Sequence, residues 1–342
     1  MSAVGRGPGA PLDGPPGAGA GRTVLVTGAS SGIGWFAARR LAALGARVLM
    51  ASRDADRGRR AAQAVRDRVA GADVEVVALD LADLRSVAAC ADEVRRRGPL
   101  DGLLSNAGGL LAGPRRTSAQ GSELTLATNH LGHAALTAAL VPVLEEAGRR
   151  TGDARVVAAG SMAHRFVRPP ADERGWQSED DFSPFRAYCR AKLAVLVHAG
   201  ELERRLREAG SPVRSLAFHP GYAVDLLDRD DPQALSDRRP RDRAPTPAAR
   251  AGALAAGLLL QGKDGGARPA VAAVLAPAAV AAGPTGARLR RRPGLVCVGP
   301  GGPLELAGAP RHVRTTAAAA DPEVAARLWA LTAQLTGVDL GP

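Results

Sequence analysis

A tyrosine and a lysine spaced four residues apart could carry out acid–base chemistry. They stand in the segment Tyr188-Cys189-Arg190-Ala191-Lys192, and a spacing of four places both side chains on one face of a helix. A tyrosine with its ordinary pKa of about 10 is a weak proton donor near neutrality, but a neighbouring ammonium group stabilises the phenolate and lowers that pKa. Because the chain has only two tyrosines and two lysines, a chance pairing on an amphipathic helix is the weaker explanation. The pair predicts proton transfer to the alkoxide that forms when a hydride reduces a carbonyl group.

A glycine-rich segment near the N-terminus fits a dinucleotide-binding turn. A predicted strand precedes it and a helical pattern follows it. In that position glycines let the backbone approach a pyrophosphate, and the helix N-terminus supplies free N–H donors. We therefore predict that a nicotinamide dinucleotide binds here. The residues of the turn are Gly28, Ser30, Ser31, Gly32, Ile33 and Gly34.

The end of the second predicted strand bears on the choice between NAD and NADP. Enzymes that use NAD commonly place a carboxylate there, whereas enzymes that use NADP place a basic residue. This chain has Ser52, Arg53 and Asp54 in sequence. Small Ser52 leaves room for a 2′-phosphate, and the planar guanidinium of Arg53 can pair with it. Two alternatives stay open: Arg53 is one more surface arginine, or Asp54 binds the ribose of NAD(H). The prediction favoured here is NADP(H).

These residues need a scaffold, and the sequence predicts one of alternating strands and helices. Short β-branched or leucine-rich runs alternate with longer alanine-rich runs, which is typical of βαβ units and a parallel sheet. We therefore predict an α/β, doubly wound Rossmann fold with a mostly parallel central sheet and helices on both faces. The predicted strands are 23–27, 46–51, 74–79, 100–104, 155–159 and 213–218. The predicted helices are approximately 32–44, 54–69, 84–96, 122–146 and 185–208, with a terminal helix capped by Asp321 and ended by Gly337.

The length of 342 residues is compatible with one large domain. Residues 1–20 are rich in glycine and proline and predict a disordered tail, followed by a single domain over 21–342. The polar, proline-punctuated stretch 228–247 follows the sixth strand. Ligands bind at that edge of such sheets, so a mobile segment there could cover a site. No run of residues reaches the roughly 18 apolar positions that a membrane span needs.

Charge and cysteine content bear on partners and compartment. The net charge is +11, but the basic residues are nearly all arginines interleaved with acids, which is typical of solvated helix faces. The densest cluster, 288–292, lacks the interleaved aromatics of a nucleic-acid site. Cys90, Cys189 and Cys297 show neither disulfide nor zinc-ligand spacing. We expect a cytoplasmic protein that binds no nucleic acid and no metal.

Together with the matching residues named below, these segments resemble the short-chain dehydrogenase/reductase superfamily over nearly all of residues 22–338. The glycine turn matches its TGxxxGxG motif, and the Tyr188–Lys192 pair matches its active-site pair. The closer resemblance is to the retinol-dehydrogenase-like and WW-domain-oxidoreductase-like branch, through the run from Gly160 to His164, the long stretch before Tyr188, the His-Pro-Gly turn and the terminal helix. The other matching residues are Asp80, Leu81, Asn106, Ala107, Gly108, Asn129, Ser161, Pro220 and Gly221.

The resemblance implies roles for four residues. Tyr188 would act as general acid/base, Lys192 would tune it and hold the nicotinamide ribose, Ser161 would orient the carbonyl, and Asn129 would anchor a water relay. It also implies a small hydrophobic carbonyl or alcohol substrate, a variable substrate lid at about 226–292, and a homodimer or homotetramer. The implied activity is NADP(H)-dependent interconversion of an alcohol and an aldehyde or ketone, acting on CH–OH groups.

Two departures from the family pattern support a different function. Val224 and Asp225 stand where the family usually has a threonine that contacts the nicotinamide carboxamide, and the stretch 226–292 matches poorly. The alternative is a catalytically impaired, dinucleotide-binding regulatory or scaffold protein.

Overall fold

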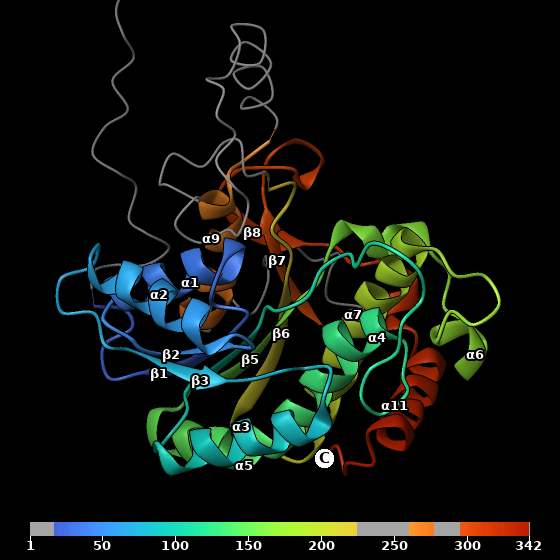
Figure 1. Ribbon diagram of the computed structural model, residues 1–342, viewed down its shortest axis with the longest axis horizontal. Coiled ribbons are helices and arrows are strands. Elements are labelled where there is room, and N and C mark those ends of the chain that lie inside the picture. The colour runs from blue at the N-terminus through green and yellow to red at the C-terminus, as the bar shows by residue number, and fades with distance from the viewer. Residues whose placement is uncertain (1–16, 224–259, 277–294, 342) are drawn as a thin grey trace, which may run out of the picture.

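A computed structural model describes residues 17–223, 260–276 and 295–341, in which strands and helices alternate (Figure 1). The strands are β1 (Thr23–Thr27), β2 (Arg47–Ser52), β3 (Val74–Ala78), β4 (Gly102–Ser105), β5 (Ala154–Ala159), β6 (Val213–Phe218), β7 (Val296–Pro300) and β8 (Pro310–Val313). The helices are α1 (Gly32–Ala43), α2 (Ala55–Arg66), α3 (Leu84–Arg96), α4 (Leu124–Leu126), α5 (Gly132–Thr151), α6 (Glu173–Trp176), α7 (Pro184–Glu208), α9 (Lys263–Leu275) and α11 (Pro322–Thr336).

All eight strands belong to one sheet, in the order β3-β2-β1-β4-β5-β6-β7-β8. The first seven pair in parallel, and β8 pairs antiparallel with β7. This confirms the predicted mostly parallel sheet. The sequence did not predict β7 and β8, because their runs are short and interrupted by glycine and proline. Strand β7 extends the sheet by pairing with β6, where Leu216 lies opposite Val296, and β8 adds to β7.

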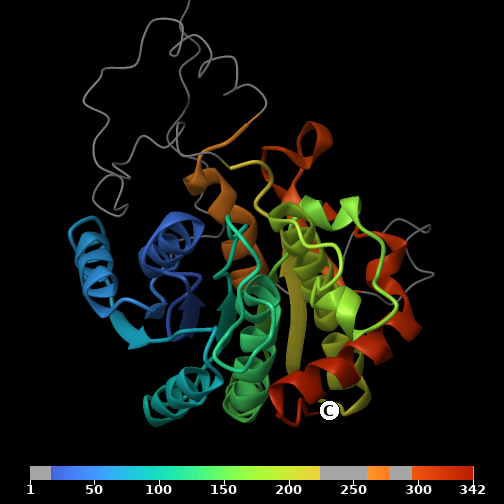
Figure 2. The same ribbon diagram turned by 45° about the vertical axis from the view of Figure 1, so that its right-hand side comes forward.

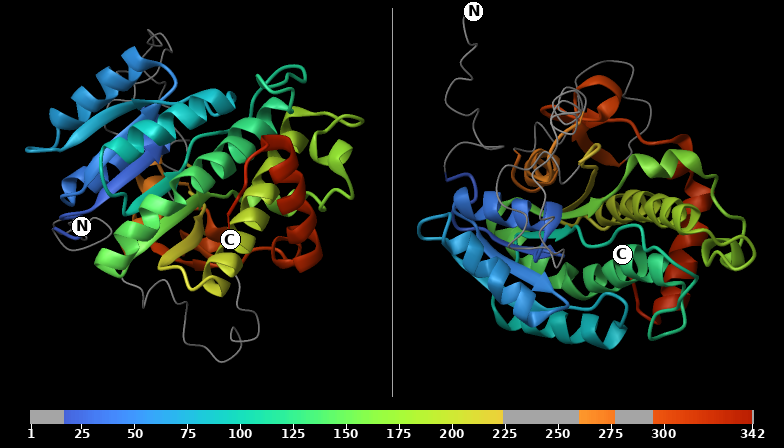
Figure 3. Two further views of the ribbon diagram at one scale, coloured as in Figure 1. Left: turned by 90° about the horizontal axis from the view of Figure 1, so that it is seen from below. Right: turned by 45° about the horizontal axis from the view of Figure 1, so that its top comes forward.

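Helices cover both faces of the sheet, as expected for a doubly wound fold (Figure 2). The core on one face joins side chains of α1, α2 and α9, including the buried Trp35 and Val271. The core on the other face joins α3, α5 and the end of α7. Helix α11 packs along α7 (Figure 3). As predicted, Asp321 caps α11 by accepting from the Glu323 and Val324 amides, and Gly337 ends it in the left-handed conformation.

The helix predicted over 122–146 is not continuous. It is divided into α4, a π-helical turn at Ala127–Leu131 and α5, which runs on to Thr151. At the start of α5 the backbone approaches the carbonyl of Leu81 so closely that a Cβ atom on Gly132 would collide with it. The break in the helix therefore allows the start of α5 to pack closely against the loop after β3. The periodicity of the sequence does not reveal this contact, because the two segments are distant in the chain.

Four residues of the predicted tail lie within the described part of the chain. Residues 17–20 form a turn in which the amide of Gly19 donates to the carbonyl of Leu44 at 2.9 Å. The part of the predicted lid region that is described contains α9, which is packed into the core. Val224, Asp225, the stretch 228–247 and the arginine cluster 288–292 lie outside the described residues. In the described ranges, none of the helices combines the length and the apolar character needed to cross a membrane.

Candidate functional site

The carboxyl ends of the parallel strands bring the predicted site residues to one edge of the sheet. The glycine turn follows β1, Arg53 follows β2, Asn106 follows β4 and Ser161 closely follows β5. Because β2, β1, β4 and β5 are neighbours, these segments lie side by side, at the edge where open α/β sheets bind ligands. Helix α7 brings Tyr188 to Ser161 from outside the sheet.

Ser161 and Tyr188 lie close to one another, and the Ser161 hydroxyl acts to lower the pKa of Tyr188. Ser161 has extended backbone geometry and caps the 3-10 helix η2 (Met162–Phe166), with its Oγ accepting from the amide of Ala163 at 3.2 Å. Helix α7 begins after Ser183, whose side chain accepts from the Arg186 amide at 3.2 Å. Two capped helix starts therefore fix the positions of both hydroxyl groups.

Lys192 lies beneath this pair in a buried position. Its Nζ donates to the carbonyl of Ala159 at 2.7 Å and lies 5.8 Å from the centre of the Tyr188 ring. Burial lowers the pKa of Lys192 to about 8, because removal from water disfavours the charged form. The predicted placement of the two side chains on one helical face is therefore observed, with the ammonium group held by the end of β5.

The expected lowering of the Tyr188 pKa is not observed. Burial raises the pKa of Tyr188 above its usual value, and the nearby Ser161 hydroxyl only partly opposes this. The ammonium of Lys192 is directed to Ala159. In this arrangement Tyr188 is held in its protonated form near neutral pH.

Asn129 lies in the π-helical turn η1 (Ala127–Leu131). Its Oδ1 accepts from the Gly109 amide at 3.0 Å, and its Nδ2 donates to the carbonyls of Gly109 and Thr125 at 3.2 and 2.9 Å. The side-chain amide is thus used by backbone groups. The side chain connects the loop after β4 to the turn before α5. The backbone carbonyl of Asn129 is not used in these bonds and is available for other contacts.

A buried hydrogen-bond network connects Asn129 to the cofactor end of the sheet. Thr27 Oγ1 accepts from the amides of Asn106 and Ala107, both at 2.9 Å. Since both lone pairs are then used, its hydroxyl is left to donate, and it lies 2.9 Å from His133 Nε2 and 3.4 Å from the Leu104 carbonyl. His133 Nδ1 in turn donates to the Asn129 carbonyl at 3.1 Å. The network fixes a neutral tautomer of His133. Sequence reasoning identified neither Thr27 nor His133 as a site residue, because their contacts span the ends of two strands and a helix.

The glycine turn has the shape that a phosphate-binding turn requires. A Cβ atom on Gly28 would lie 2.9 Å from Ala107 Cα, and one on Gly34 would collide with the Gly28 carbonyl and with the Asn106 side chain. Within the described chain, the Ser31 side chain forms no capping hydrogen bond to the first turn of α1. The amides at this helix start can therefore bind phosphate oxygens, and the residues present fit a dinucleotide.

The two residues considered for the adenosine end differ in their surroundings. Arg53 is exposed at the end of β2. Asp54 is the N-cap of α2, and its Oδ1 accepts from the Arg57 amide at 3.0 Å. This hydrogen bond is the main reason that the pKa of Asp54 lies below its usual value. One oxygen of Asp54 is therefore used to hold α2.

The remaining predicted cofactor residues shape the same edge. Asp80 Oδ1 accepts from the Ala82 amide at 2.9 Å, which bends the chain after β3 next to the buried Leu81. Gly108 has a φ of +127°, and a Cβ atom there would collide with the Asn129 side chain. After β6, the Pro220 carbonyl accepts from Gln261 Nε2 at 2.6 Å. Gly221 follows with a φ of +67°.

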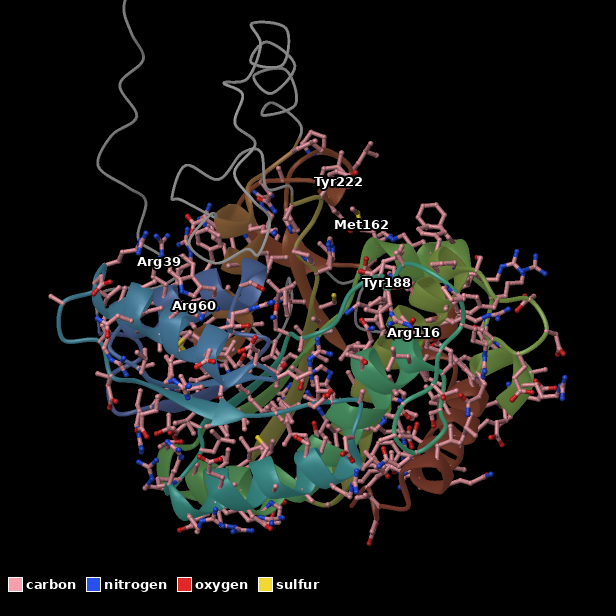
Figure 4. The ribbon with its side chains drawn as sticks, viewed as in Figure 1. Arg39, Arg60, Arg116, Met162, Tyr188 and Tyr222 are labelled. Atoms are coloured by element: carbon pink, nitrogen blue, oxygen red, sulfur yellow. The ribbon has the colours of Figure 1, made fainter. Side chains whose placement is uncertain are left out.

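Exposed aromatic side chains stand on η2, which Ser161 caps, and on α7, which carries Tyr188. Phe166 at the end of η2 is 71% exposed and Phe185 at the start of α7 is 52% exposed, and their ring centres lie 6.0 Å apart. Tyr222, after β6, is also exposed. Figure 4 shows Tyr222 and Met162 in the upper part of the molecule, on the same side as Tyr188. These side chains therefore offer apolar surface to a ligand.

Comparison with known proteins agrees with this geometry. Residues 22–171 match the family model described as short chain dehydrogenase. The chain is 38% identical to polyprenol dehydrogenase of Mus musculus over 210 residues, covering 61% of this chain and 62% of that protein. It is also 38% identical to retinol dehydrogenase 12 of Homo sapiens over 209 residues, covering 61% and 64%. The chain thus spans a little under two thirds of the length of these relatives.

A solved structure extends the similarity over nearly the whole chain. A crystal structure of an uncharacterized protein from Mycobacterium Paratuberculosis is 35% identical, covers 94% of this chain and 96% of its own, and superposes with a TM-score of 0.68. The matched family model includes the glycine turn, Asn129 and Ser161 and ends before Tyr188. The chain is thus similar to short chain dehydrogenases over residues 22–171 and to polyprenol and retinol dehydrogenases over about 61% of its length, and it has the parallel sheet and glycine turn expected from that resemblance.

Proposed function

We propose that this protein is an NADP(H)-dependent oxidoreductase that interconverts an alcohol and an aldehyde or ketone of a hydrophobic substrate. The observation that carries the proposal is the convergence of Ser161, Tyr188 and the buried Lys192, whose ammonium group is held by the Ala159 carbonyl 5.8 Å from the centre of the Tyr188 ring. This group lies at the same sheet edge as a glycine turn that fits a dinucleotide. Proton-transfer and cofactor-binding residues therefore converge where the family binds its ligands.

A dinucleotide held by the glycine turn would supply the hydride for carbonyl reduction. The hydroxyl of Ser161 donates a hydrogen bond to the substrate oxygen, where negative charge develops. The Tyr188 hydroxyl transfers its proton to that oxygen. Burial raises the pKa of Tyr188, so its hydroxyl is protonated near neutral pH. Reduction needs this protonated hydroxyl as the proton donor. Lys192, positioned by Ala159, stabilises the phenolate that remains.

The preference for NADP(H) over NAD(H) is supported by the end of β2. Exposed Arg53 can pair with a 2′-phosphate. Asp54, the alternative partner for a ribose hydroxyl, uses one carboxylate oxygen to cap α2. The hydrophobic substrate is supported by the exposed, paired rings of Phe166 at the end of η2 and Phe185 at the start of α7. A reducing, cytoplasmic location is supported by Cys90, Cys189 and Cys297, which are free thiols.

The proposal is tested by following NADPH and NADH oxidation with straight-chain aldehydes and ketones of increasing length. We expect turnover with NADPH, and a kcat/KM that rises with chain length because each buried methylene contributes about 0.8 kcal/mol. Turnover that favours NADH would contradict the cofactor assignment. Tight NADPH binding without turnover of any carbonyl or alcohol would instead support the regulatory or scaffold alternative.

A further inference from the structure

Helix α9 brings a second lysine to the glycine turn. Helices α1 and α9 pack side by side on one face of the sheet (Figure 1). An ion pair joins their ends: Arg40 of α1 donates to both carboxylate oxygens of Asp264, at 3.0 and 2.8 Å. The Arg40 side chain is only 7% exposed, and Arg39 adds a contact to Asp264 at 2.9 Å. The first turn of α9 is therefore fixed on α1.

A second anchor holds the start of α9 from the other side. Gln261 Nε2 donates to the Pro220 carbonyl at 2.6 Å, and the Gln261 amide donates to the Tyr222 carbonyl at 3.3 Å. The residue that starts α9 is thus placed between α1 and the Pro-Gly turn after β6. Both of these segments are expected to contact the cofactor.

The residue in that place is Lys263. A Cβ atom built on Gly32 would lie 3.7 Å from both Cδ and Nζ of Lys263. Gly32 is the first residue of α1 and has a φ of +57°, so a side chain is disfavoured there on conformational grounds as well. The Lys263 ammonium group therefore lies directly beside the N-terminus of α1, where the amides of the glycine turn are directed.

We propose that Lys263 binds the pyrophosphate of the dinucleotide, together with the backbone amides of the glycine turn. The inference rests on the proposed function, since it assigns a further residue to the same cofactor site. An ammonium group is a compact charge with three donors and binds phosphate as a point charge. It would add to the partial positive charge at the start of α1. The anchors at Asp264 and Gln261 hold Lys263 in place before the cofactor arrives, which reduces the entropy lost on binding.

The test compares Lys263→Gln with the unchanged protein by calorimetric titration of three ligands: NADPH, NADP⁺ and adenosine 2′-monophosphate. A hydrogen bond to a charged group contributes enough that its loss weakens binding about tenfold. We expect this loss for both dinucleotides, and unchanged binding of adenosine 2′-monophosphate, which has no pyrophosphate. Lys263→Arg keeps the charge and should recover most of the affinity. Arg96→Gln, which removes one exposed charge at the far end of α3, is the matched control and should bind all three ligands normally.

The possible outcomes separate the inference from the proposed function. If the unchanged protein binds NADPH and Lys263→Gln binds it equally well, the assignment of Lys263 is wrong and the proposed function stands. If Lys263→Gln weakens the adenosine ligand as much as the dinucleotides, the lysine acts through its general field and the pyrophosphate assignment is wrong. If the unchanged protein binds no dinucleotide, the proposed function and the inference both fail.

Discussion

Lowering the pH from about 7 to about 5 should destabilise this protein through its buried histidines. Burial lowers the pKa of His133 to about 4, with the Asn129 carbonyl opposing the shift and the Lys192 charge adding to it. Burial also lowers the pKa of His198 to about 4 and that of His130 well below its usual value. Protonation of His133 would add an N–H on Nε2, facing Thr27 Oγ1. The lone pairs of that oxygen already accept from the amides of Asn106 and Ala107. The folded protein therefore resists taking up these protons.

The sign and size of the effect follow from linkage. An unfolded histidine has a pKa of about 6.5, so below that pH the unfolded state binds protons that the folded state excludes. The stability contribution of His133 is complete above that pH and is lost as the pH falls towards its folded pKa of about 4. At about pH 5, roughly 1.5 units below the unfolded pKa, the loss is about 2 kcal/mol for each such histidine. Because His130 and His198 act in the same direction, the total loss should exceed this value.

Carboxylates interfere little in this interval. Where the pKa of a carboxylate is clearly shifted it is lowered, as for Asp83 with its Arg85 partner, so the contribution of Asp83 is lost mainly below its unfolded value of 3.8. The range from about pH 7 to about pH 5 therefore reports mostly on histidines.

The assay is urea unfolding at the two pH values, followed by tryptophan fluorescence and circular dichroism. The matched variant is His133→Gln, which removes the titrating group while keeping a polar side chain. It should be less stable than the unchanged protein at neutral pH but should lose about 2 kcal/mol less on acidification. Equal unfolding free energies of the unchanged protein at both pH values would refute the reasoning. An equal loss in the variant would show that His133 is not responsible.

Three further outcomes are expected. Tyr188→Phe should reduce turnover by at least about 100-fold, because it removes the proton donor, and should bind NADPH normally in a fluorescence titration; comparable activity would contradict its assignment. Arg53→Ala should weaken NADPH about tenfold through loss of a charge-assisted pair and leave NADH unchanged, and an equal loss for both would place Arg53 outside the 2′-phosphate site. Gly34→Ala should lower the unfolding free energy by about 1–3 kcal/mol, since its Cβ would collide with the Gly28 carbonyl. Gly109→Ala, where a Cβ has open space, should be nearly neutral, and equal melting temperatures of the two variants would contradict the collision.

Several features of the site could be predicted from the sequence because they depend on local patterns. Alternating apolar runs predicted strands such as Thr23–Thr27 and Val213–Phe218 at their observed bounds. The four-residue spacing of Tyr188 and Lys192 predicted their shared helical face. The caps of α11 at Asp321 and Gly337 were readable because each acts on the residues next to it.

Tertiary structure decided the features that depend on contacts between distant segments. The pKa of Tyr188 is raised because packing buries it and because Lys192 is directed to Ala159 on another element. The π-helical turn around Asn129 is packed against two loops that are distant in sequence, through Gly132 at the loop after β3 and the Asn129 side chain at the loop after β4. Lys263 reaches Gly32 across more than two hundred residues of sequence through the Arg40–Asp264 ion pair. Sequence periodicity specifies which elements form and which faces they bury, whereas the distance between two charges is fixed only when those elements pack.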